Sequence, residues 1–338
     1  MNEYQVHPES SSLPPISIVI PNYNGVRLLR ENLPVVLAAL NAYPGKGEVL
    51  VVDDGSQDDS VELLRESFPE VTCVVHEVNK GFSEAMLTGV VSAKNEVLIL
   101  LNSDVAPRQD FAEPLIRAVL NQDVFAVQPV IKDENGHVNP YSIFLFKFGW
   151  GRLRRVPADH YLERDRCYCV YASGGSMAVM KSRFLALGGF HPVYKPFYWE
   201  DFDLCFRAWR RGWKSMVVMS SVVVHQDQGS IRDHYKRKTI RNALNRNKLV
   251  MEWVHFPVST LVTTAIPRVA GRLLGRLLVG DVSYFSVLSQ AIVRWPEIRK
   301  LRAELKETSV MGFKDVIRLV DSENQAMASK EQGTSHVH

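Results

Sequence analysis

Three short acidic segments of this 338-residue chain carry the side chains best suited to chemistry. Two of them directly follow apolar runs, and the third opens a segment with helical periodicity. A histidine after a further apolar run completes the set. The candidates are Asp53 with Asp54, the triplet Asn102-Ser103-Asp104, Glu200-Asp201 with Asp203, and His225.

Asp53 and Asp54 are two adjacent carboxylates, and the start of a helix needs only one of them. One member can complement the start of the following helix, because acidic side chains are favourable at helix N-termini. The other can accept hydrogen bonds from a nucleobase or a ribose. The chain has no Gly-rich phosphate loop, which argues against a nicotinamide enzyme or a P-loop kinase.

The triplet ending at Asp104 follows a later apolar run. Such triplets are commonly simple turns, so position gives this one its weight. The fourth strand of a doubly wound sheet would place Asp104 beside Asp54. Hard divalent cations bind carboxylate oxygens together with substrate phosphate oxygens. These residues therefore predict a metal and nucleotide site.

Glu200 and Asp201 open a helix next to the aromatic residues 197–199. Acids at a helix start often only offset the dipole, which can be the whole role of Asp203. An apolar wall, however, raises the pKa of a carboxyl toward that of a useful base. His225 is followed by the polar residues 226–230, so it heads a loop rather than a core position.

The elements that must position these side chains alternate between strand and helix. This alternation predicts an α/β fold with a mainly parallel, doubly wound sheet flanked by helices. Ligands bind such sheets at the carboxyl ends of the strands, where the acidic residues occur. We expect strands at 16–20, 48–52, 71–76 and 96–101, and helices at 26–40, 60–68 and 82–92.

The next part of the chain is less regular. Residues 132–171 predict a long loop that serves as a lid or acceptor surface. Beyond it, we expect a strand at 177–180, a short helix ending at Gly188, a helix at 204–211 and a strand at 222–224.

Composition changes after residue 230. Residues 232–248 contain seven basic residues and one acidic residue, and Arg268, Arg272 and Arg276 follow at intervals of four. A basic, amphipathic segment suits an anionic membrane surface. Alternatively, these helices pack on the catalytic domain or form a homodimer. We expect a polar leader at 1–14, a catalytic domain at 15–230 (a nucleotide-sugar half at 15–130 and an acceptor half at 131–230), a helical extension at 231–320 and a disordered tail at 321–338.

Bulk composition narrows the setting. Lys and Arg number 40 against 37 Asp and Glu, a net charge of +3, which argues against a generic nucleic-acid binder. The four cysteines have no zinc-ligand spacing and predict reduced thiols. The N-terminus predicts no signal peptide, and the longest uncharged, mostly apolar stretch, 253–267, is too short to cross a bilayer. We expect a cytoplasmic protein that can lie peripherally on the inner face of the plasma membrane.

Seven segments in order resemble the family 2 glycosyltransferases, in particular the bacterial rhamnosyltransferase-like members, which have the GT-A fold. The resemblance covers residues 16–230. Its motifs are residues 20–24 (IPNYN), 51–56 (VVDDGS), 79–82 (NKGF), 101–104 (LNSD), 188–190 (GGF), 199–204 (WEDFDL) and 225–230 (HQDQGS).

The resemblance implies roles by position. Asp54 matches the nucleoside-binding aspartate, Asp104 and His225 match metal ligands for Mg²⁺ or Mn²⁺, and Asp201 matches the catalytic base, with Glu200 beside it. The residues implied to bind the nucleotide sugar are Pro21, Asn22, Tyr23, Asn24, Asp53, Asp54, Asn79, Gly81, Phe82, Asn102, Ser103, Gly174 and Gly175.

One position departs from the family pattern. The metal-binding triplet usually reads Asp-x-Asp, whereas its first member here is Asn102, a weaker ligand than a carboxylate. The implied reaction is a direct, inverting displacement that moves a sugar from a UDP or dTDP donor to a hydroxyl of a glycan or lipid-linked glycan.

Three other functions were compared with this one. A processive membrane-spanning synthase is rejected, because the segment from Gln290 to Trp295 is one residue longer than the matching synthase motif and no spans are predicted. A nucleotidyltransferase would carry a basic Gly-rich loop after the first strand, and residues 21–25 are not one. A non-catalytic relic of the fold would not need Asp54, Asp104, Asp201 and His225 together.

Overall fold

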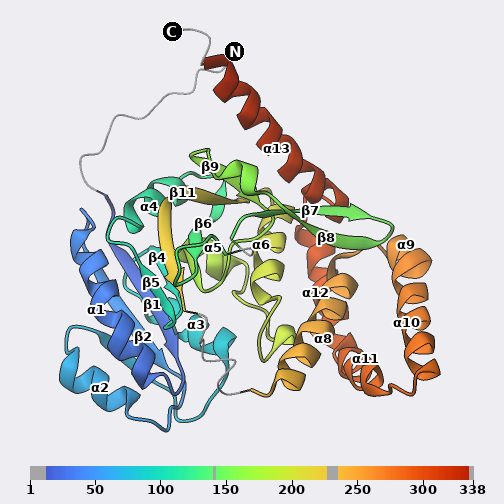
Figure 1. Cartoon of the computed structure of the whole chain (residues 1–338), viewed down its shortest axis with the longest axis horizontal. Coiled ribbons are helices and arrows are strands. Elements are labelled where there is room, and N and C mark those ends of the chain that lie inside the picture. Colours follow the sequence, from blue (N-terminus) through green and yellow to red (C-terminus); the bar gives the residue numbers. More distant parts are fainter. Residues whose placement is uncertain (1–12, 140–141, 227–234, 335–338) are drawn as a thin grey trace.

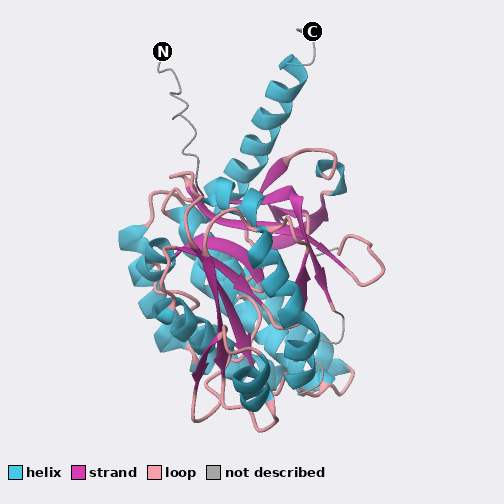
Figure 2. Cartoon of the chain, turned by 90° about the vertical axis from the view of Figure 1, so that its left-hand side faces the viewer, coloured by secondary structure: helices cyan, strands magenta, loops and turns pink. Residues whose placement is uncertain are grey.

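The computed structural model describes residues 13–139, 142–226 and 235–334. Eleven strands are present in these residues, and nine of them form one sheet with helices on both sides (Figures 1 and 2). The strands are β1 Ile16–Asn22, β2 Gly47–Asp53, β3 Thr72–Val75, β4 Val97–Leu101, β5 Val105–Pro107, β6 Val124–Lys132, β7 Phe144–Gly149, β8 Arg152–Pro157, β9 Arg166–Cys169, β10 Ser176–Met180 and β11 Lys214–His225.

The first four long strands form a parallel half-sheet in the order β3-β2-β1-β4. Their apolar runs are continuous because both faces are covered, as in other parallel sheets. Along β4, Ile99 packs into the core on one face and Leu98 and Leu100 into the core on the other. The helices of this half are α1 Val26–Ala42, α2 Ser60–Ser67, α3 Phe82–Ser92 and α4 Ala112–Val119.

The second half adds antiparallel pairs, so the sheet is mixed while most of its strands are parallel, as predicted. β10 lies antiparallel between β4 and β6, while β11 runs parallel to β6 and antiparallel to β5 and β9. The register between β5 and β11 pairs Val105 with His225. Two helices belong to this half, α5 Lys181–Ala186 and α6 Glu200–Arg210.

Residues 132–171 are not the predicted long loop. β7 and β8 form a hairpin whose two-residue turn is Trp150 and Gly151, both with positive φ (52° and 62°). That backbone geometry matches the twist of hairpin strands. The hairpin is held down by Phe144, Leu145 and Phe146, which are buried in the core. β9 then pairs with β11 at the sheet.

The C-terminal extension is helical, as predicted. Its first helix, α8, and its last helices pack on the catalytic half through one shared apolar core. No helix in the described ranges is long and apolar enough to span a membrane. The helices are α8 Arg237–His255, α9 Val258–Thr260, α10 Ile266–Leu278, α11 Ser283–Val293, α12 Trp295–Thr308 and α13 Phe313–Thr334.

The predicted disordered tail is wrong for residues 321–334, which continue helix α13. Its apolar residues Phe313, Val316 and Val320 recur at helical spacing and are buried. One turn further, the Asn324 amide accepts from the Tyr168 N–H (2.7 Å) and donates to the Tyr168 carbonyl (2.9 Å). These two hydrogen bonds attach α13 to β9, although the composition of residues 321–334 alone predicts disorder.

Candidate active site

The ends of β1 and β2 are joined by Asp53, which is fully buried. Its carboxylate accepts from Asn22 Nδ2 (2.9 Å), the Ser56 N–H (2.9 Å) and the Ser56 hydroxyl (2.6 Å). Asn24, with φ 49°, accepts from the Gln57 N–H at 2.7 Å. Asp53, Asn22 and Asn24 therefore hold two strand-end loops together.

Asp54 fixes a different segment. It is 3% exposed and accepts from His76 Nδ1 (2.7 Å), the Lys80 N–H (2.9 Å) and the Gly81 N–H (2.7 Å). The loop that precedes α3 is thus tied to the end of β2. A side chain at Gly55 would meet the backbone of Val78 and Asn79 at 2.7–2.9 Å. The structure brings the predicted residues Asp54, Asn79 and Gly81 to one place.

Asp104 and His225 also come together. His225 Nε2 lies 3.8 Å from Asp104 Oδ2, because β5 and β11 pair next to both residues. Burial raises the pKa of Asp104, and the neighbouring His225 opposes that shift. Asn32 supports the triplet by donating to the Ser103 carbonyl at 2.8 Å.

The residues of this corner have the free atoms that a cation needs. Asn102 Oδ1, Asp104 Oδ1 and His225 Nδ1 are buried and have no hydrogen-bond partner in the part of the chain that the structure describes. Buried polar atoms are otherwise almost always paired. No group of three His, Cys, Asp or Glu side chains is positioned for a metal within the described residues. The set fits a cation that takes few protein ligands and completes its shell with substrate phosphate and water, as Mg²⁺ does.

Two glycines connect this corner to the carboxylates of α6. A Cβ at Gly175 would lie 2.6 Å from Asn102 Nδ2, and one at Gly174 would lie 3.4 Å from Asp201 Cβ. The Asn102 N–H donates to the Gly175 carbonyl at 2.9 Å, and the Gly174 N–H points to Asp201 Oδ2 at 3.4 Å. A side chain at Gly175 would clash with Asn102, so the close approach there needs a glycine. The cation corner and the candidate base are therefore adjacent.

A strained turn presents Glu200 and Asp201. Tyr198 and Trp199 both have positive φ (75° and 77°), which is rare for bulky residues and costs free energy. Asn247 on α8 stabilises this turn, because its Nδ2 donates to the carbonyls of Phe197 (2.9 Å) and Tyr198 (3.0 Å).

Burial raises the pKa of both carboxyls. It raises the pKa of Asp201 to about 6, against its hydrogen bonds from Phe202 and Gly174. Burial and the neighbouring Asp201 charge raise the pKa of Glu200 well above its usual range, and Glu200 Oε2 has no hydrogen-bond partner among the described residues. Carboxyls with raised pKa values are common at catalytic sites.

Asp203 has a structural role, as its predicted place at a helix start implies, but it does more than offset the helix dipole. It is fully buried and bonded by Arg207 Nε (2.7 Å), His255 Nε2 (2.9 Å) and the Tyr194 hydroxyl (3.0 Å). Burial alone would raise the pKa of Asp203, yet Arg207 and His255 hold it well below its usual range.

Sequence reasoning missed three residues of this site: His76, Asn247 and His255. Their partners lie 22, 49–53 and 52 positions away along the chain. No local pattern marks them, because their roles come from tertiary contacts. Phe82 is placed as predicted near the site, with its ring 5.5 Å from Phe190, which packs on Gly174.

The strand order, the helices on both faces and the acidic strand ends are those of the GT-A fold, which confirms the predicted fold. Residues 17–182, just under half of the chain, match the sequence profile described as Glycosyl transferase family 2.

Two relatives show how far the likeness extends. Polypeptide N-acetylgalactosaminyltransferase 16 of Mus musculus is 26% identical over 231 residues, 64% of this chain and 41% of that protein. The undecaprenyl-phosphate 4-deoxy-4-formamido-L-arabinose transferase of Pseudomonas fluorescens is 34% identical over 116 residues, 33% of this chain and 34% of that protein. This chain spans less than half the length of these relatives.

Two solved structures share the fold. GalNAc-T7 with UDP, GalNAc and Mn²⁺ has a TM-score of 0.54 at 19% identity, covering 73% of this chain and 49% of that one. The mannosyltransferase PcManGT from Pyrobaculum calidifontis with GDP-Man and Mn²⁺ has a TM-score of 0.53 at 16% identity, covering 96% and 90%. At these identities the likeness shows the fold alone.

Proposed function

We propose that this protein is an inverting glycosyltransferase that moves a sugar from a UDP- or dTDP-linked donor to a hydroxyl of a glycan or lipid-linked glycan. The observation that carries the proposal is the adjacency of Asn102 and Asp201 across Gly174 and Gly175. This places a candidate proton acceptor next to the corner suited to a cation and a diphosphate.

In the proposed reaction, the acceptor oxygen bonds to the anomeric carbon from the face opposite the diphosphate, and the bond from that carbon to the diphosphate oxygen breaks. Asp201 takes the proton of the acceptor hydroxyl, since a carboxyl with a pKa of about 6 is ionised near neutral pH. Glu200, whose pKa burial raises well above its usual range, orients the acceptor by hydrogen bonding. The transition state is oxocarbenium-like, as in glycoside hydrolysis.

Asp104 and His225, assisted by Asn102, would hold Mg²⁺ or Mn²⁺. A cation there stabilises negative charge that develops on the leaving nucleoside diphosphate. Asp54 supports the nucleoside by fixing the loop at residues 79–82, with residues 21–24 on the other side. Mn²⁺ in the two structural neighbours supports the cation assignment.

The alternatives have less support. The family domain at residues 17–182 disfavours a nucleotidyltransferase. A non-catalytic relic of the fold would not need Glu200, a buried glutamate whose Oε2 has no partner among the described residues, beside Asp201, which lies close to Gly174.

We propose that the protein is cytoplasmic and lies on the inner face of the plasma membrane. The alternative role of the C-terminal helical extension is to form a homodimer.

A donor panel tests the proposal. Purified protein with Mn²⁺ is incubated with UDP- and dTDP-linked sugars, dTDP-rhamnose included, and release of nucleoside diphosphate is measured with and without lipid-linked glycan. We expect one donor to be turned over and release to increase with acceptor. No release from any donor under either condition would contradict an enzymatic role.

A further inference from the structure

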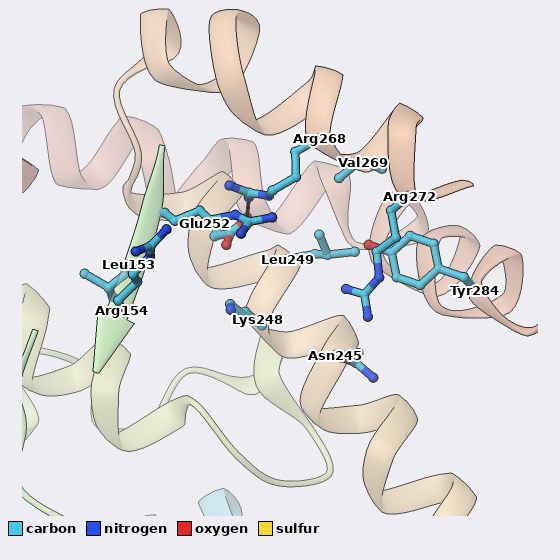
Figure 3. Close-up of a pocket in the computed structure, with 11 residues that line it drawn as sticks. Leu153, Arg154, Asn245, Lys248, Leu249, Glu252, Arg268, Val269, Arg272 and Tyr284 are labelled. Atoms are coloured by element: carbon cyan, nitrogen blue, oxygen red, sulfur yellow. Dashed lines mark hydrogen bonds and ion pairs between the residues drawn. The ribbon is translucent and has the colours of Figure 1, made fainter. Parts of the chain in front are cut away.

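A strongly basic cavity lies away from the donor site, between the β7–β8 hairpin and helices α8, α10 and α11. Its volume is about 590 Å³ (Figure 3). Five cationic side chains and one carboxylate line it. These are Arg152, Arg154, Lys248, Arg268, Arg272 and Glu252.

Only one of the five cations is neutralised by a carboxylate. Arg268 pairs with Glu252 and also donates to the Gly151 carbonyl, which ties α10 to the tip of the hairpin. Arg272 stacks on Tyr284, with its guanidinium 4.6 Å from the ring centre. Within the described residues, Arg152, Arg154, Lys248 and Arg272 form no ion pair. Such a cluster of unpaired cations is suited to a group with several negative charges, such as a diphosphate.

Helix α8 links the cavity to the active site. Lys248 and Glu252 lie on the face that lines the cavity, and the adjacent residue Asn247 holds the turn in front of Glu200 and Asp201. A helix is about 10 Å across with its side chains. A ligand in the cavity therefore lies about one helix width from the catalytic turn.

Helix α10 carries an exposed apolar face. The arginines at positions 268 and 272 extend from α10 toward α8 in Figure 3, and no residue of α10 is buried. Leu274 and Leu278 are 60% and 80% exposed, and Val279, directly after the helix, is 77% exposed. An interfacial helix has this arrangement, with apolar side chains in the acyl region and cations at the headgroups.

We propose that the basic cavity binds the phosphate or diphosphate headgroup of a lipid-linked acceptor, while the exposed leucines of α10 lie among the lipid chains. Charge complementarity selects the headgroup, and the exposed apolar side chains on the other side of α10 select a lipid over a free anion. This inference rests on the proposed transferase function, because it names the class of acceptor.

The test compares charge-matched variants. Arg154→Gln/Lys248→Gln removes two cavity cations, and Arg299→Gln/Lys306→Gln removes two exposed cations of α12 that form no ion pair among the described residues. Vesicles of phosphatidylcholine with farnesyl diphosphate, or with phosphatidylglycerol at equal charge, are used in flotation assays. Inorganic diphosphate binding is measured by calorimetry.

The cavity variant is expected to lose about tenfold or more affinity for both inorganic diphosphate and farnesyl diphosphate vesicles, since charge-assisted hydrogen bonds are lost. The α12 variant keeps both affinities. Leu274→Ser/Leu278→Ser keeps diphosphate affinity and loses vesicle binding.

Equal losses in the cavity and α12 variants would overturn the inference, as would equal binding to phosphatidylglycerol vesicles, which indicates general surface attraction. Inorganic diphosphate bound as tightly as the lipid would identify a free-anion site instead. None of these binding assays contains a sugar donor. If the transferase proposal alone is wrong, the donor panel shows no turnover while vesicle binding remains intact.

Discussion

The carboxylate of Asp54 is already satisfied by donors of the protein itself, from His76, Lys80 and Gly81. We therefore expect Asp54 to act on the nucleotide mainly through the loop it holds. Asp54→Ala should weaken UDP or dTDP binding by about 1–3 kcal/mol, the cost of unpairing buried polar groups.

Calorimetric titration of the folded variant checks this prediction, and the melting temperature should fall together with the affinity. An unchanged affinity would remove Asp54 from the nucleotide site. A lower affinity with an unchanged melting temperature would instead favour direct contact with the nucleoside.

Metal dependence is a second prediction at the residue scale. Chelation with EDTA should abolish transfer, and Mg²⁺ or Mn²⁺ should restore it, because Asp104 and His225 leave ligand atoms unpaired. Asn102→Asp restores the acidic first position of the triplet and should tighten Mn²⁺ binding measured by calorimetry. Full activity in excess EDTA would contradict the cation assignment.

Sequence reasoning was informative where a residue's role depends on its place in the chain. Asp104 follows β4, and strand pairing brings it to His225. The family resemblance implied that pair, whereas the strand-end pattern alone predicted Asp104 beside Asp54. The sequence predicted only that Asp53 and Asp54 have different roles. Which of them bridges strand loops and which holds residues 80–81 depends on distances that no local pattern contains.

Among the elements, α8 connects the extension to the catalytic turn. Asn247→Ala leaves the carbonyls of residues 194, 197 and 198 without their donor. We expect the turn at Tyr198 and Trp199 to relax, because its strained backbone needs external support. Turnover number should fall several-fold, by about 1 kcal/mol or more in barrier height, while nucleotide affinity stays constant.

The matched control is Asn242→Ala, on the same helix, whose side chain forms no hydrogen bond with the described residues. Steady-state kinetics and nucleotide titration are measured for both variants. Equal turnover in the two would show that α8 only packs against the catalytic half, and a selective rise in the donor KM would place the effect in donor binding instead.

Element prediction from the sequence succeeded where burial produces a simple pattern. The four strands and three helices expected before residue 102 are present. Buried parallel strands give continuous apolar runs and amphipathic helices give apolar residues at helical spacing, so both can be recognised in the sequence. The hairpin of β7 and β8 was missed because its strands are short and its turn contains Trp150 beside a single glycine. The second half of α13 was missed because Asn324, a polar residue, docks it.

At the scale of the whole molecule, folding depends on the buried charges behind the site. The pKa of Asp203 is lower in the folded protein than its unfolded value of about 3.9. Ionisation of Asp203 therefore stabilises the folded state above about pH 4, and this contribution is lost as the pH falls toward the folded pKa. Burial lowers the pKa of His255, so acid opposes folding there as well.

Asp203→Asn should lower the free energy of unfolding by about 3–5 kcal/mol near neutral pH, because Arg207 and His255 lose a buried charged partner. The deficit should narrow below about pH 4. Urea unfolding near neutral pH and in acid measures both effects. Asp110→Asn, which breaks the exposed pair with Arg108, is the control and should change stability little. A deficit independent of pH would contradict the electrostatic account.

The chain as a whole joins residues 17–182, which match the family 2 glycosyltransferase profile, to helices that support the turn at Tyr198 and Trp199. The central claim is that Asp201 is the base of a sugar transfer. Asp201→Asn keeps the shape of the side chain and removes the proton acceptor, and Glu200→Gln is its matched control.

The decisive measurement is the single-turnover rate of sugar transfer for the wild type and these two variants, with the donor identified by the panel. We expect Asp201→Asn to fall by about 10²-fold or more, with donor affinity and melting temperature nearly unchanged and Glu200→Gln less affected. The wild-type rate should also decline as the pH falls through about 6, because protonated Asp201 cannot accept a proton. Near-normal transfer by Asp201→Asn would contradict the account, and a dead Glu200→Gln beside it would assign the base to Glu200.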